Sequence, residues 1–340
     1  MKAAGEGACI RRVVFAAIPA RRRSKSRRTN VSVCLGATFR GRRQIFDDAG
    51  GTAEVLTILF DGVAYGMLLF VLACGLSVTL GLMNFINLAH GAFAMAGGYA
   101  AAILMNRYGV PFLAALPAAF AFAALLGVAL ERTLYRRLYG ASHLDQVLFT
   151  IGLVFMAMPI ANYFLGDQPQ PAHVPAFLSG RFEIAGISIG VYRLFIIAIC
   201  GAIAGGVEAL LISTRFGAQL RAAVDDRRVA SGLGINVDRL FAVAFAIGSG
   251  LAGLGGALAA DMVGGIDPSF PVKFMVSFLI VVAIGGSNGV VGSLLGALLL
   301  GILDVAGKYY VPSLGAFIIY AVMIVTLIVR PQGLFSRGGR

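Results

Sequence analysis

The feature that most constrains the fold of this sequence is a series of long apolar runs. The clearest of them are residues 55–80, 111–130, 191–213, 240–260, 274–303 and 316–329. A helix needs about 20 residues to cross a hydrocarbon core about 30 Å thick, and most of these runs reach that length. We therefore predict an all-α, polytopic integral membrane protein with about eight transmembrane helices, some of them broken or re-entrant.

The composition agrees with a membrane protein and argues against a soluble one. Of the 340 residues, 59% are hydrophobic, 13% are charged and 45 are glycine, whereas about 25% of the residues of a soluble domain are charged. Small residues within the apolar runs favour close packing of helices in lipid. A single large soluble helical core is the alternative, and unbroken apolar spans of this length argue against it.

The formal charge of +12 is concentrated at the start of the chain. Residues 1–50 hold 12 lysines and arginines against three acids. Their composition cannot bury enough apolar surface to fold alone. We interpret residues 1–50 as a basic disordered extension, or as a start assigned too far upstream, and residues 54–336 as the transmembrane domain. No nucleic-acid-binding fold accompanies the basic residues, so we expect no nucleic acid among the partners.

The spacing of the cysteines and histidines predicts neither a metal site nor a disulfide framework. The four cysteines form no CxxC pair, and the three histidines form no HExxH motif. The sequence also contains no GxxxxGK[ST] loop, which cradles the phosphates of ATP in many ATPases. We expect no cofactor, and if ATP drives this protein, another subunit binds it.

The positions of the basic residues predict the orientation of the chain in the membrane. Short loops rich in lysine and arginine favour the cytoplasm, which places residues 132–137 and 215–239 inside and the proline-rich loop 166–193 outside. Counting back through two crossings then places the basic extension outside, against the same rule. Either the extension is not translated, which we favour, or residues 81–98 form a broken or re-entrant helix.

Polar side chains interrupt the apolar sequence at residues 81–91 and within the first run. Asn84, Asn87 and His90 stand between two apolar stretches, and Asp61 lies within the first. In lipid such groups are costly unless they are paired or face a cavity. The two amides and the histidine either line a pathway or cap helix ends and hold a break in place. Asp61 either pairs with a basic residue of another helix or is protonated.

This stretch resembles the LivH-type permeases of branched-chain amino acid ABC transporters, whose first two helices are joined by a similar Asn-Phe-Ala-His-Gly-Glu signature. The matching positions are Asn87, Ala89, His90 and Gly91, whereas Leu88 replaces the phenylalanine and Ala92 the acid. The glycine-rich residues 285–296 and the chain end 330–335 resemble the same family. The resemblance covers about residues 54–336, which it identifies as a permease domain.

Another block of the resemblance lies in the basic segment 214–239. This segment is similar to the family's coupling loop, a helix that docks into a groove of the ATPase subunit. The matching positions are Arg221, Ala222, Asp226, Ala230, Gly232, Gly234, Ile235 and Asn236. If the segment forms one helix, Ala222, Asp226 and Ala230 lie four residues apart and share a face. A solvated connector is the alternative.

The resemblance implies a permease subunit of an ATP-driven importer that moves branched-chain or related small amino acids across the cell inner membrane without changing them chemically. The implied partners are a LivM-type second permease subunit, two ABC ATPase subunits, an extracytoplasmic substrate-binding protein and the lipid bilayer. The pathway candidates are Asn84, Asn87, His90, Gly91 and Asp61. An ABC permease for urea, amides or sugars and an ion-coupled secondary transporter are the alternatives.

Overall fold

The computed structural model describes residues 50–334 except 84, 86, 185–186, 287–288 and 331–332. Within this part the elements are α2 Gly50–Met83, α3 His90–Tyr108, α4 Phe112–Thr133, η2 Tyr135–Leu138, α5 His143–Leu165, β1 Arg181–Ile184, β2 Ile187–Gly190, α6 Val191–Ser213, α7 Arg215–Asp225, α8 Arg227–Gly232, α9 Val237–Met262, α10 Phe270–Gly285, α11 Gly289–Tyr310 and α12 Gly315–Val329. Residues 1–49 lie outside the described residues, so the interpretation of the extension stays a prediction.

The helices confirm the prediction of an all-α polytopic membrane protein. Six of the described helices, α2, α4, α5, α6, α9 and α11, are long and apolar enough to cross a membrane. Helix α10 and the segment Phe317–Val329 of α12 are shorter apolar helices. The sequence did not single out α5 among its clearest runs, because polar residues occupy its first turn.

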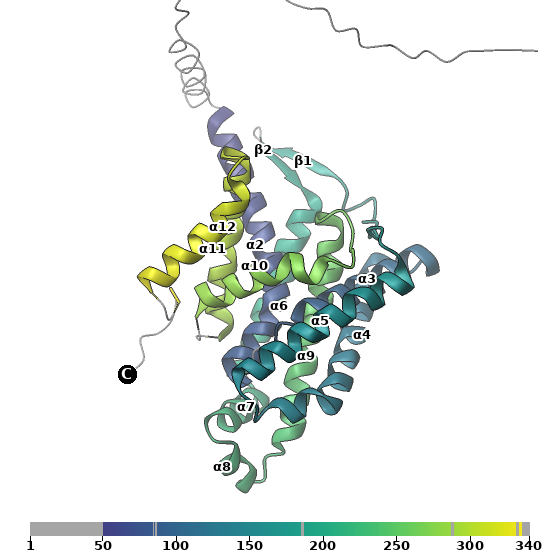
Figure 1. Cartoon of the computed structure of the whole chain (residues 1–340). Coiled ribbons are helices and arrows are strands. Elements are labelled where there is room, and N and C mark those ends of the chain that lie inside the picture. The colour runs from purple at the N-terminus through teal and green to yellow at the C-terminus, as the bar shows by residue number, and fades with distance from the viewer. Residues whose placement is uncertain are drawn as a thin grey trace, which may run out of the picture. The chain divides into compact units, whose positions relative to one another are not determined.

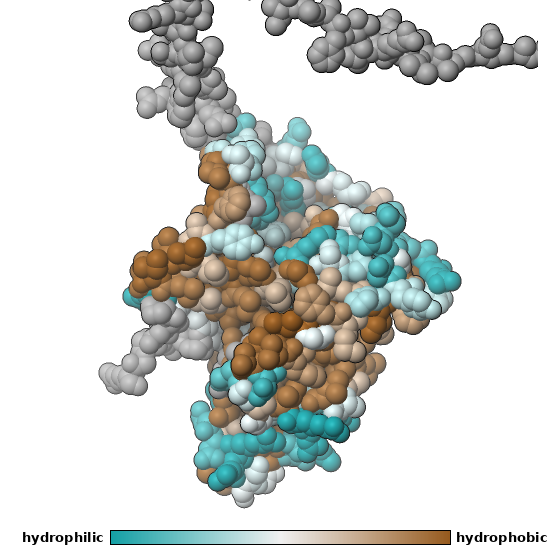
Figure 2. Space-filling model, viewed as in Figure 1, coloured by the Kyte–Doolittle hydropathy of each residue, from teal (hydrophilic) through white to brown (hydrophobic). Residues whose placement is uncertain are grey.

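The segments predicted to face opposite sides of the membrane lie at opposite ends of the helices. Helices α7 and α8 lie at one end, called here the α8 end, and the antiparallel β1–β2 hairpin lies at the other, called the hairpin end (Figure 1). Apolar residues gather between the two ends on the face in view (Figure 2). This distribution is the one expected of a chain surrounded by lipid in its middle.

Glycines allow the central helices to approach closely. A Cβ atom built on Gly301 of α11 would lie 2.4 Å from the Cα of Gly66 in α2, and one built on Gly97 of α3 would lie 2.2 Å from the Cα of Gly253 in α9. Real side chains do not pack so close to a backbone. The contacts of α2 with α11 and of α3 with α9 therefore require glycine at these positions.

The long apolar run at residues 274–303 is divided into two helices, as the glycine-rich break predicts. Gly286 ends α10 with a φ of 71°, a conformation that favours glycine. Helix α11 then runs back along α10. A Cβ atom built on Gly285 would lie 2.8 Å from the backbone of Gly292, and one on Gly296 would lie 2.9 Å from the carbonyl oxygen of Val281.

The close approach of α3 and α9 leads to the first prediction. The substitution Gly97→Val should lower the free energy of unfolding by about 1–3 kcal/mol or more, because the added side chain meets backbone that cannot move aside. Gly152→Val in α5 is the matched control, since a Cβ atom at Gly152 meets nothing within 4 Å. Thermal denaturation of the detergent-purified protein measures the difference, and equal midpoints for the two variants would contradict this packing.

Candidate functional site

The break between α2 and α3 contains two buried polar side chains, and both are satisfied within the chain. Asn87 and His90 are each only 1% exposed. The ring nitrogen Nε2 of His90 donates a hydrogen bond to the carbonyl oxygen of Leu72 in α2 over 2.8 Å. The hydroxyl group of Tyr135 donates to Oδ1 of Asn87 over 3.1 Å. Asn84, the third polar residue of the motif, lies outside the described residues.

The packing around His90 and Gly91 explains why these residue types follow the break. A Cβ atom added at Gly75 would lie 2.5 Å from the Cε1 atom of His90. The rings of His90 and Phe278 of α10 are nearly perpendicular, with their centroids 6.1 Å apart. A Cβ atom on Gly91 would lie 2.9 Å from the Cα of Pro271. These contacts hold α2, α3 and α10 together, which favours the reading that the motif stabilises a break.

An aromatic cluster lies between the break and the α8 end. Tyr135 is fully buried, with its ring centroid 5.4 Å from that of Phe85 and 4.7 Å from that of Phe245. The Tyr139 ring lies 5.7 Å from Phe85 and 5.6 Å from Phe241. The sequence did not point to either tyrosine, because Tyr135 lies within residues 132–137, which were interpreted only as a basic loop, and Tyr139 follows that loop. The available signal was the presence of two tyrosines within five residues at the end of an otherwise basic loop.

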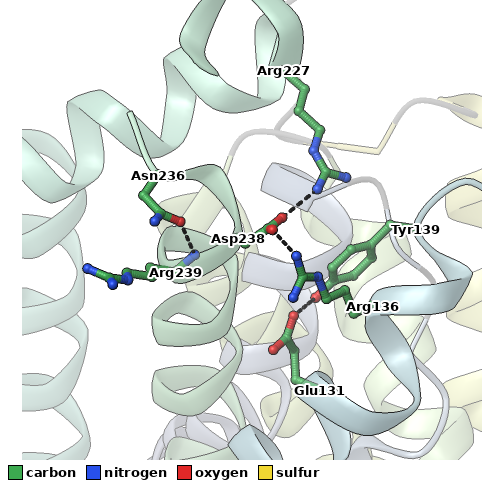
Figure 3. Close-up of polar contacts among 7 residues, drawn as sticks. All are labelled: Glu131, Arg136, Tyr139, Arg227, Asn236, Asp238 and Arg239. Atoms are coloured by element: carbon green, nitrogen blue, oxygen red, sulfur yellow. Dashed lines mark hydrogen bonds and ion pairs between the residues drawn. The ribbon is translucent and has the colours of Figure 1, made fainter. Parts of the chain in front are cut away.

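A polar cluster ties the ends of three elements together at the α8 end (Figure 3). Asp238 of α9 forms ion pairs with Arg136 of η2 and with Arg227 of α8, the second over 2.7 Å. Nearby, the hydroxyl group of Tyr139 donates to Oε1 of Glu131 over 2.9 Å. Burial, reinforced by the Glu131 carboxylate, raises the pKa of Tyr139 above its usual value, so this hydroxyl remains a proton donor.

The predicted coupling segment does not form one helix, which corrects the expectation that Ala222, Asp226 and Ala230 share a face. Helix α7 ends at Asp225, and Asp226 has the extended backbone angles φ −150° and ψ 105°. Its carboxylate accepts hydrogen bonds from the backbone N–H groups of Arg228 at 2.8 Å and Val229 at 3.0 Å. An aspartate that caps the next helix competes with continuation of the previous one.

The residues of the coupling segment therefore separate into buried and exposed groups. Ala230 is 1% exposed and packs in a small core with Leu220 and Phe241, whereas Ala222 is exposed. A large residue at position 230 would thus disturb packing within this chain before it met any partner. Of the other matching positions, Arg221 donates to the carbonyl oxygen of Leu211, Gly232 is the last residue of α8, and Gly234 turns the chain with a φ of 83°.

The tip of the segment exposes apolar side chains among charged ones. Val229 in α8 is 59% exposed, and Leu233, the residue after α8, is 75% exposed. Arg227 and Arg228 stand beside them in the sequence and are exposed too. A mixed apolar and basic tip of this kind is suited to contact with another protein.

Asp61 is paired, which is one of the two possibilities that the sequence left open. Its carboxylate forms an ion pair with Arg193 at the start of α6. Both side chains line an open cavity of about 820 Å³ at the hairpin end, together with His173, Arg181 and Asp261. Among the described residues, no group of three His, Cys, Asp or Glu residues could hold a metal ion.

The chain is similar to known transport proteins over most of its length. The family described as "Branched-chain amino acid transport system / permease component" matches residues 58–327. The high-affinity branched-chain amino acid transport system permease protein BraD of Pseudomonas aeruginosa is 26% identical over 82% of this chain and 95% of its own length. The corresponding protein LivH of Escherichia coli is 27% identical over 82% and 94%. No solved structure gives a significant match.

The buried hydrogen bond at the break leads to the second prediction. The substitution Tyr135→Phe should lower the free energy of unfolding by about 1–3 kcal/mol, because it leaves the Asn87 amide oxygen buried without its donor. Tyr163→Phe is the control, since Tyr163 is 85% exposed. The measurement is the thermal denaturation midpoint of each variant, and a Tyr135→Phe midpoint equal to that of the control would show that the bond does not stabilise the break.

Proposed function

This chain belongs to the family of permease components of branched-chain amino acid transport systems, and we propose that it forms one half of the transmembrane path of an ATP-driven amino acid importer. The match over residues 58–327 carries the proposal, because it includes the break between α2 and α3, the coupling segment and the paired helices α10 and α11. As a member of this family, the chain is a multi-pass membrane permease.

The proposed complex contains subunits that this chain lacks. No P-loop occurs in the sequence, so separate ATPase subunits supply the energy. A second permease subunit completes the path, and an extracytoplasmic binding protein delivers the amino acid to the hairpin end. The open polar cavity around Asp61 and Arg193 lies at that end and would receive it. The α8 end then faces the cytoplasm, in agreement with the basic residues of its loops.

We place the contact with the ATPase subunits at the tip formed by α8 and Leu233. The apolar side chains of Val229 and Leu233 are 59% and 75% exposed there, and arginines stand next to them in the sequence. Movement of α8 would be passed on through the ion pair of Arg227 with Asp238, and through Arg136 to η2. Helix η2 carries Tyr135, whose hydroxyl group is bonded to Asn87 in the break.

This series of contacts supports a specific form of coupling. ATP shifts a conformational equilibrium only if the nucleotide-bound ATPases bind one conformation of the permease better than the other. A connection from α8 to the α2–α3 break would make the shape of the path depend on that preference. Asn87, His90 and Gly91 then shape the path by holding the break, whereas the amino acid itself contacts other groups.

The alternatives differ in what they require of Asp61 and of the substrate. An ion-coupled transporter would use Asp61 as an ion ligand, but its carboxylate is paired with Arg193. Urea and simple amides carry no charge, so they form no ion pair with the carboxylates and guanidinium groups that line the outer cavity. An amino acid zwitterion matches such a mixed lining, so the cavity favours amino acids.

The proposed ATPase contact leads to the third prediction. The substitution Leu233→Asp should reduce ATP-dependent uptake by at least about tenfold and weaken co-purification of the ATPase subunits, because an apolar anchor at an interface becomes charged. Val311→Asp, in the exposed loop after α11, is the control. Uptake into membrane vesicles and the yield of the ATPase subunits measure the effect. Normal uptake and normal co-purification by the Leu233→Asp variant would exclude this tip as the contact.

A further inference from the structure

Two neighbouring cavities lie between α4 and α9, close to the α8 end. The first is polar, has a volume of about 300 Å³ and includes the start of α9. The second is mostly apolar, has a volume of about 290 Å³ and lies further along both helices. Arg132, Arg239 and Ala242 line both cavities. The two cavities therefore adjoin in one groove, called here the α4–α9 groove, which is basic at one end and apolar along the rest.

The apolar part of this groove is open to the outer surface of the chain. Its apolar residues are Phe120, Ala124 and Val128 on α4 and Ala242, Val243, Ala246 and Ile247 on α9. Val243 is 48% exposed, and all the others except Ala242 are partly buried. Inside a bilayer, such an opening is covered either by an acyl chain or by an apolar helix of another subunit.

The depth of the groove favours an acyl chain. The lining extends about 18 Å along α4, from Arg132 to Phe120, and about 12 Å along α9, from Arg239 to Ile247, at the rise of an α-helix. One leaflet supplies about half of a hydrocarbon core that is about 30 Å thick. A transmembrane helix of another subunit would cross the whole core. A groove that ends near the midplane therefore fits a chain from one leaflet.

The basic end of the groove carries two arginines that are free to bind an anion. Three arginines and two acids line the polar cavity, and both acids are already engaged. Asp238 is paired with two other arginines, and Glu131 accepts a hydrogen bond from Tyr139. Within the described part of the chain, the guanidinium groups of Arg132 and Arg239 form no ion pair and no hydrogen bond.

The Arg239 side chain points away from Asp238 (Figure 3), and both Arg132 and Arg239 are exposed. Guanidinium groups suit phosphate because they donate paired hydrogen bonds to its oxygen atoms. A phosphate at the membrane boundary, continued by an apolar chain that reaches about to the midplane, is the arrangement of a phospholipid. The groove thus offers matching chemistry at both of its ends.

We propose that the α4–α9 groove binds one acidic phospholipid from the leaflet at the α8 end. Its phosphate group contacts Arg132 and Arg239, and one of its acyl chains lies between α4 and α9. A headgroup with an added positive charge would weaken the attraction to the two arginines, so the site prefers a lipid with a net negative charge. The proposal requires a chain that spans the membrane and does not depend on which substrate the chain transports.

The first test removes the charges at the basic end. The whole transporter complex, purified in mild detergent, is loaded with phosphatidylglycerol or with phosphatidylcholine that has the same acyl chains. Native mass spectrometry measures the lipid that is retained. The wild type should prefer phosphatidylglycerol at least about tenfold, as two arginines near an acidic lipid allow, and the double variant Arg132→Gln with Arg239→Gln should lower this preference to about twofold or less.

The matched control removes the same charge elsewhere at the α8 end. Arg137→Gln with Arg215→Gln replaces two exposed arginines that line neither cavity, and this variant should keep the preference of the wild type. Absence of a preference in the wild type, or an equal loss of preference in the two double variants, would overturn the proposal.

The second test examines the apolar part of the groove. Ala124→Phe places a ring in the space of the acyl chain and should lower the retained phosphatidylglycerol at least about fivefold. Ala202→Phe, on the exposed side of α6, places the same ring outside the groove and should retain lipid as the wild type does. Equal retention by these two variants would contradict the assignment.

Two further measurements distinguish the lipid from other occupants. A large excess of inorganic phosphate should leave phosphatidylglycerol in place, because free phosphate has no acyl chain, and displacement would indicate a site for phosphate alone. A photocrosslinker in place of Ala246 should label lipid in the whole complex. Labelling of another subunit instead would show that a protein covers the groove and would refute the proposal.

Discussion

The structure depends on the need to satisfy polar groups where no water is available. A polar side chain inside a bilayer must find its partner within the protein. At the break between α2 and α3, Asn87 finds the hydroxyl group of Tyr135, and His90 finds the carbonyl group of Leu72. Because Tyr135 belongs to η2, this requirement fixes the end of α4 beneath the break.

The same requirement connects the break with the α8 end. Once η2 is fixed, Arg136 reaches Asp238 at the start of α9, and Asp238 also holds Arg227 of α8 (Figure 3). Close glycine contacts make α2, α3, α9 and α11 a tightly packed group, whereas an apolar cavity of about 770 Å³ lies between α5 and the α3–α4 pair. The fold thus combines a tightly packed centre with one peripheral helix, α5, that buries only four of its described residues.

The apolar runs, together with the polar residues and glycines that interrupt them, predicted much of this fold. The breaks near His90 and Gly286 follow from polar residues and glycines within apolar sequence. The partners of the polar groups did not follow, since Arg193 is 132 positions away from Asp61 and only the fold brings them together. The coupling segment has the spacing of one helix, but the N-cap preference of Asp226 prevailed over that spacing.

The most direct test of the account measures coupling through Asp238 in the reconstituted complex. The substitution Asp238→Asn removes the negative charge that holds Arg136 and Arg227 and leaves the exposed apolar residues of the proposed ATPase contact, Val229 and Leu233, unchanged. The measurement is the number of ATP molecules hydrolysed per amino acid imported by proteoliposomes that contain the binding protein. We expect the Asp238→Asn complex to retain ATP hydrolysis while amino acid uptake falls about tenfold, a factor within the usual range for coupling between two sites. An unchanged ratio of hydrolysis to uptake would contradict it.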